Sequence, residues 1–81
     1  MWELEYSEEV KLYFVDNGDL VFDVLVKIEE LKFLEDGIPE GATLLQAEVN
    51  TYRWPILNHW VVYEKLERQP PTLKIWVVKP R

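Results

Sequence analysis

The chain has 81 residues, of which 48% are apolar and 14% aromatic, and a formal net charge of −6. This length suits one domain over residues 1–81 with a single small core, and the apolar content excludes an intrinsically disordered chain. The absence of cysteine excludes disulfides and thiolate metal sites. The negative charge argues against capture of nucleic acid by simple electrostatic attraction.

The charge is distributed unevenly along the chain. Residues 1–48 contain 13 Asp and Glu and 3 Lys and Arg, a balance of −10, whereas residues 49–81 contain 2 and 6, a balance of +4. A solvated acidic helix surface explains this pattern as well as a functional surface does. The acidic start lacks the features of a signal peptide, and no apolar run approaches the roughly 20 residues of a membrane span. We therefore expect a cytoplasmic protein that is not in a membrane.

Residues 2–6 predict a strand, and the residues that follow predict a short helix. Apolar and acidic side chains alternate in the first segment, as they do in a half-buried strand. Ser7 suits the N-cap of a helix that extends to about Val15, and Gly18 suits the left-handed position after its end. The side chains of the strand that should face the core are Trp2, Leu4 and Tyr6.

A second helix is expected from Leu20 to about Glu35, with Asp19 as its N-cap. Its apolar residues form two stripes on opposite sides of the helix. A single sheet rarely covers both sides of a helix in a small domain, so the first helix or a partner protein must cover the second stripe. We expect the first helix to cover part of it. The first stripe is Leu20, Val24, Ile28, Leu31 and Leu34, and the second is Phe22, Val26 and Phe33.

The second half of the sequence predicts three consecutive strands. Gly and Pro mark residues 36–43 as a connector, and strands are expected over residues 44–54, 56–66 and 72–80. The predicted fold class is α+β with the order β-α-α-β-β-β, in which two N-terminal helices pack on a mainly antiparallel four-stranded sheet. Three tryptophans of these strands should pack in the core, with stacking on nucleic-acid bases as the alternative. They are Trp54, Trp60 and Trp76.

Three segments carry a resemblance to a known family. Trp2–Glu9 is similar to an opening strand that leads into a helix with an acidic start. Asn58–Glu64 is similar to a third strand in which apolar residues separate a polar residue or His from Tyr, and Leu73–Lys79 to a final strand. Together with the element order, these segments resemble the RelE/ParE superfamily of toxins from bacterial type II toxin–antitoxin systems, over nearly the whole chain.

This resemblance implies a toxin-like function. RelE-type members cut messenger RNA on the ribosome, and ParE-type members act on DNA gyrase. The implied partners are therefore a cognate antitoxin protein and either ribosome-bound mRNA or gyrase. RNA cleavage requires attack by a 2′-hydroxyl on the adjacent phosphate, assisted by a general base, a general acid and cations.

The resemblance also implies roles for individual residues. By position in the family's motifs, the catalytic residues would be His59, Tyr63 and Arg81. The residues that bind RNA phosphate would be Arg53, Lys74 and Lys79. The antitoxin helix would pack on Phe22, Val26 and Phe33.

Several alternatives stay open. A lone histidine on a strand is more often a structural residue than a catalytic one, and the third-strand arginine common in RelE-type nucleases is replaced by Trp60 or His59. The alternative function is a catalytically inactive protein-interaction module on the same fold. No cofactor is expected, and no metal site either, because only Glu64 and Glu67 lie near His59 in the sequence. The oligomeric state is open, a homodimer included.

Overall fold

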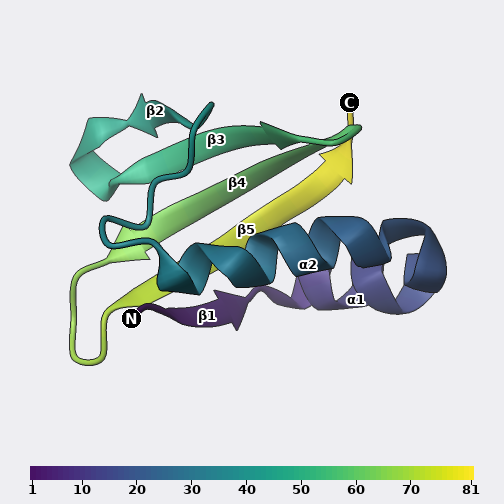
Figure 1. Cartoon of the computed structure of the whole chain (residues 1–81), viewed down its shortest axis with the longest axis horizontal. Coiled ribbons are helices and arrows are strands. Elements are labelled where there is room, and N and C mark those ends of the chain that lie inside the picture. Colours follow the sequence, from purple (N-terminus) through teal and green to yellow (C-terminus); the bar gives the residue numbers. More distant parts are fainter.

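The computed structural model describes the whole chain, Met1–Arg81, and shows helices lying against one side of a sheet (Figure 1). The class is α+β, as predicted. The helices are α1 (Glu8–Asn17) and α2 (Phe22–Glu30), and the strands are β1 (Glu3–Tyr6), β2 (Thr43–Gln46), β3 (Thr51–Ile56), β4 (His59–Leu66) and β5 (Thr72–Pro80).

The sheet has five strands in the order β1-β5-β4-β3-β2. β1 runs parallel to β5, and the other neighbours are antiparallel, so the sheet is mixed. A parallel pair requires a crossover connection, and the two helices provide the first part of it. Figure 1 shows α1 and α2 alongside β1 and β5, while β2 forms the opposite edge of the sheet.

Ser7 begins α1 in the way that the sequence predicts. Its Oγ accepts a hydrogen bond from the backbone N–H of Val10 at 3.2 Å, which satisfies one of the free donors at the helix start. Gly18 ends the helix with φ +44°, and its N–H bonds the carbonyl of Phe14. The glycine is needed there because side chains rarely adopt this conformation.

The second helix is shorter than the prediction of Leu20–Glu35. 3₁₀ turns flank α2, η1 (Gly18–Val21) before it and η2 (Leu31–Phe33) after it. Leu20 lies in η1 and is exposed, and Val21 is buried instead, because the tighter 3₁₀ turn rotates the side chains out of helical register. The prediction that Asp19 caps this helix is wrong, since its side chain makes no cap hydrogen bond.

The predicted strand over residues 44–54 is two strands, which is why the sheet has five strands and not four. A 3₁₀ turn, η3 (Ala47–Val49), separates β2 from β3, and Asn50 follows it in the left-handed conformation with φ +51°. Asn tolerates that conformation better than most residues because its short side chain bonds locally. The chain reverses here, so β2 pairs antiparallel with β3.

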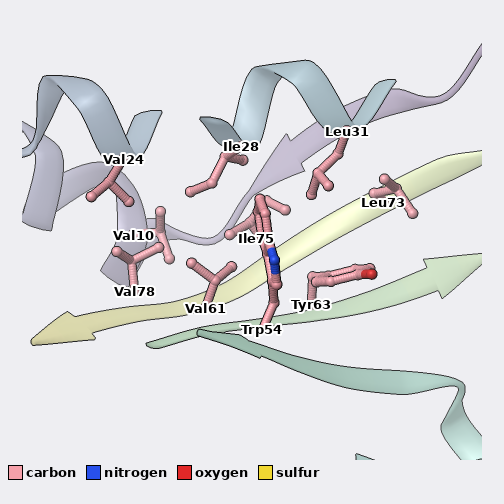
Figure 2. Packing of buried hydrophobic residues seen from close by; sticks show 10 residues of the cluster. All are labelled: Val10, Val24, Ile28, Leu31, Trp54, Val61, Tyr63, Leu73, Ile75 and Val78. Atoms are coloured by element: carbon pink, nitrogen blue, oxygen red, sulfur yellow. The ribbon is translucent and has the colours of Figure 1, made fainter. Parts of the chain in front are cut away.

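The core lies between the helices and the sheet (Figure 2). Side chains of α1 and α2 point toward the sheet, and side chains of β3, β4 and β5 point back at them. Of the tryptophans expected in the core, only Trp54 is buried there. Trp60 and Trp76 lie on the other side of the sheet, so their predicted core packing is wrong. The cluster consists of Val10, Val24, Ile28, Leu31, Trp54, Val61, Tyr63, Leu73, Ile75 and Val78.

The strand at the start of the chain packs as predicted, with its three apolar side chains against the core cluster. None of the helices has the length and apolar composition that crossing a bilayer requires.

Candidate functional site

The sheet has one face covered by helices and one open face. Side chains alternate between the two faces along each strand, and a bulge in β5 at Trp76 shifts this alternation by one residue. Trp54 and its partner Val61 point into the core, so Arg53 and its partner Val62 point to the open face. The open face is therefore where exposed polar side chains of β3, β4 and β5 meet.

One end of the open face carries three cations around a tryptophan. The guanidinium of Arg53 lies 4.6 Å from the ring centroid of Trp60, and that of Arg81 lies 5.3 Å from the same ring. Lys79 is paired with Trp60 across β4 and β5. We call Arg53, Trp60, Lys79 and Arg81 the basic patch.

No carboxylate neutralises the basic patch. The ion pairs of the molecule all involve other residues. Arg53, Trp60 and Lys79 line a hollow of about 300 Å³, together with Leu45 and Val62. Arg81 is held in place because its Nη1 donates to the carbonyl of Leu57 at 3.0 Å. A weakly hydrated guanidinium next to an aromatic ring is well suited to bind an anionic or stacked ligand.

The other end of the open face is neutralised internally. Glu5 lies 3.3 Å from Lys74 and 2.7 Å from Arg68. The hydrogen bond from Lys74 is the main cause that holds the pKa of Glu5 below its ordinary value. Trp76 lies against Lys74, 4.4 Å from the ring centroid to Nζ, and donates to Glu64 at 3.0 Å. Lys74 is thus separated from the basic patch and already paired.

His59 and Tyr63 lie on the covered face, away from these cations. His59 is buried, and its Nε2 is 2.7 Å from the hydroxyl of Tyr13 on α1. Its Nδ1 is 2.9 Å from the side-chain oxygen of Asn58, so both ring nitrogens have a partner. Packing between α1 and β4 accounts for these contacts.

Tyr63 is fully buried and its hydroxyl donates to the carbonyl of Gly37 at 2.9 Å. Its ring stacks on Tyr52 with centroids 5.6 Å apart. Burial, more than the nearby Tyr52 and Asp36, raises the pKa of Tyr63 above its ordinary value. A buried phenol with a raised pKa and a satisfied hydroxyl stabilises the fold and does not exchange protons readily at neutral pH.

The structure therefore does not bring the expected catalytic residues together. His59 and Tyr63 face the helices, and Arg81 lies on the open face. Of the residues expected to bind phosphate, Arg53 and Lys79 meet in the basic patch and Lys74 does not. No three His, Asp or Glu side chains lie close enough together to hold a metal ion.

A second exposed surface lies on α2 and η2. Phe22, Val26 and Phe33 are 59%, 39% and 67% exposed. They line a groove of about 320 Å³ together with Leu25, Glu29, Glu30 and Lys32. We call Phe22, Val26 and Phe33 the α2 patch. The expectation that the first helix covers part of it is wrong, because α1 lies against β5 and not against this side of α2.

Sequence reasoning missed Trp60 and Leu45 as parts of the open face. The alternation of side chains along β4 contains the signal for Trp60, since it has the opposite parity to His59 and Tyr63. The sequence does not indicate that Leu45 lies on the open face, because its position depends on how β2 folds back on β3.

The fold and its surfaces define an α+β protein with one helix-covered and one open sheet face. Comparisons with protein-family models, with curated proteins and with solved structures find no match. The resemblance to the RelE/ParE superfamily therefore stays a prediction.

Proposed function

We propose that this chain is a protein-interaction module of the toxin–antitoxin type, which binds an antitoxin-like partner through the α2 patch. The observation that carries the proposal is the exposure of Phe22, Val26 and Phe33 on one side of α2 and η2. Two large aromatic side chains that line one exposed groove are costly to leave in water. They are typical anchors of a helix-binding groove.

The partner segment is expected to be an amphipathic helix with basic flanks. Its apolar side chains would fill the groove, as spaced anchors do in helix-in-groove complexes. The surroundings of the groove are acidic, because residues 1–48 have a balance of −10. The two lysines nearest the groove are already paired, Lys27 with Glu30 and Lys32 with Glu29. Basic residues in the partner would therefore find complementary charge and associate faster.

A nuclease is less well supported by the geometry. A general base must come within hydrogen-bond reach of the proton that it removes. His59 is buried on the opposite face of the sheet from Arg53, Lys79 and Arg81, and both its nitrogens are occupied. A cluster of cations without a base or acid can bind a phosphate but has no group to transfer the proton.

The basic patch favours a second candidate, a toxin that acts on ribosome-bound mRNA or on gyrase. Three unpaired cations around Trp60 would suit RNA phosphate and a stacked base. In this case the open face contacts the target, and binding of the partner to the α2 patch regulates it.

One experiment with two sets of variants separates the candidates. The chain is expressed alone and together with the product of a small neighbouring reading frame, with growth and complex formation as the measurements. The module predicts normal growth and a complex that Phe33→Lys weakens at least about tenfold, since the variant loses an apolar anchor and a charged side chain is desolvated in its place. Leu12→Lys is the matched control, because Leu12 is an equally exposed apolar residue on α1 outside the groove.

Two results would contradict the proposed module. Growth arrest that Arg53→Ala and Arg81→Ala relieve, while Lys11→Ala does not, would support the toxin. A complex that forms equally well with Phe33→Lys would remove the α2 patch from the proposal.

A further inference from the structure

β2 is an edge strand that nothing covers. All four of its residues are exposed, and it has β3 on one side and no strand on the other. Figure 1 shows it at the border of the sheet farthest from α1 and α2. Its outer backbone groups are therefore free to pair with another strand.

The side chains of β2 do not prevent such pairing. Edge strands are commonly protected by charged side chains, proline, a covering loop, a bulge or a short length. β2 reads Thr-Leu-Leu-Gln and contains neither charge nor proline, although it has only four residues and a bulge at Leu45. The opposite edge, β1, is different, because Glu3 and Glu5 place carboxylates on it.

The side chains of Leu44 and Leu45 are about half exposed, and they lie on opposite faces of the sheet. Leu44 is 51% exposed and pairs with Tyr52, whose ring stacks on the buried Tyr63. Leu45 is 50% exposed and lines the hollow of the open face. Both are open because the sheet ends there, so a strand added beside β2 would bury both of them.

We propose that two copies of this chain pair through β2, antiparallel, into one continuous sheet with five strands from each copy. A two-fold contact places the same surface of both copies together. In a chain of net charge −6, pairing through the acidic surfaces would bring carboxylates against carboxylates. The run from Thr43 to Ala47 has no charge and escapes this repulsion, whereas β1 carries the exposed carboxylate of Glu3, which is in none of the ion pairs.

The pairing is independent of what the α2 patch binds, since α2 lies along the other edge of the sheet. It goes beyond the proposed function because it assigns an assembly surface to β2, which the α2 patch does not use and of which only Leu45 lines the hollow beside the basic patch.

Sedimentation equilibrium of the full chain over a broad concentration range tests the proposal. The wild-type mass should rise from 9.7 kDa toward twice that value as concentration increases. Leu45→Lys should raise the dissociation constant about a hundredfold or more, because each dimer would bury two ammonium groups without partners. Thr43→Lys, a change in the exposed edge itself, is the second variant in case Leu45→Lys lowers stability, and circular dichroism confirms folding of both.

A control variant and a second measurement test whether the dimer forms through β2. Leu20→Lys replaces an exposed leucine of η1 and should leave the dimer unchanged. Hydrogen exchange should show that the amides of β2 become slower to exchange at concentrations where the dimer forms. A wild-type chain that stays monomeric at every concentration overturns the proposal. So does a dimer that survives both edge variants but is lost in Phe33→Lys, since that dimer would use α2.

Discussion

Ser7 connects the first helix to the last strand with one side chain. Its hydroxyl accepts from Val10 at 3.2 Å and donates to the carbonyl of Trp76 at 3.0 Å. Its backbone N–H bonds the carbonyl of Ile75 at 3.0 Å. The residue therefore fixes both the start of α1 and the distance between α1 and β5.

Replacing this hydroxyl should lower stability measurably. Ser7→Ala removes the N-cap and one hydrogen bond to β5, so the free energy of unfolding should fall by about 1–2 kcal/mol. Ser7→Thr keeps the hydroxyl and should lose much less. Urea unfolding followed by circular dichroism measures both values, and equal stability of Ser7→Ala and wild type would show that the cap is dispensable.

Strand alternation explains why the residues predicted for the site do not all lie together. His59 shares strand parity with Val61 and Tyr63, and this alternation alone indicates the buried face. The resemblance assigned His59 and Tyr63 a catalytic role without regard to which face they occupy. Arg53 and Lys79 could be placed together only with the register between β3, β4 and β5. That register depends on the two-residue reversal between β3 and β4, on the loop between β4 and β5, and on the bulge in the second pair.

At the scale of elements, helices and strands were easier to predict than the breaks between them. The strand at residues 2–6 and the cap at Ser7 have strong local signals. The 44–54 segment alternates apolar and polar side chains throughout, so its pattern predicts one strand. The break at η3 comes from the left-handed conformation of Asn50. A polar residue inside an alternating run does not by itself predict this conformation.

The connector between α2 and β2 depends on Gly37. This glycine has φ +70°, and an added Cβ would lie 3.0 Å from the ring of Trp2 and 3.2 Å from Leu73. Its carbonyl also accepts the hydroxyl of Tyr63. The tight approach of the backbone to these side chains closes the end of the core.

Gly37→Ala should therefore destabilise the protein more than the same substitution at a glycine where an added Cβ has free space. Gly41→Ala is the matched control, because Gly41 also has positive φ, +92°, but has nothing within 4 Å of an added Cβ. The control should cost about 1 kcal/mol from backbone strain. Gly37→Ala should cost about 1–3 kcal/mol more from overpacking. Thermal and urea unfolding of both variants provide the comparison, and equal losses would contradict the crowding.

At the scale of the whole molecule, one partly buried and one fully buried phenol, Tyr6 and Tyr63, link stability to alkaline pH. Tyr6 bonds the carboxylate of Glu29 across β1 and α2, and burial is the first cause that raises its pKa, with this hydrogen bond as the second. Burial also raises the pKa of Tyr63. The folded chain thus holds these protons at pH values where the unfolded chain has released them.

The stability should be constant with respect to these groups below about pH 10 and should fall as the pH rises above it. The sign follows because the folded state binds more protons than the unfolded state in that range. Tyr6→Phe should show a shallower decline than wild type, although it is less stable at neutral pH. Urea unfolding at a series of alkaline pH values measures the slope, and identical slopes would exclude Tyr6 as a source.

Leu45 belongs both to the edge of the sheet and to the wall of the basic hollow. A strand that docks against β2 would therefore alter the wall of this hollow, and an anion held by Arg53 and Trp60 would lie in the same hollow as this leucine. By thermodynamic linkage, any effect of one event on the affinity of the other is reciprocal and equal in size. A polyphosphate titration should accordingly shift the association constant of the chain, so that the edge of the sheet would report what the open face has bound.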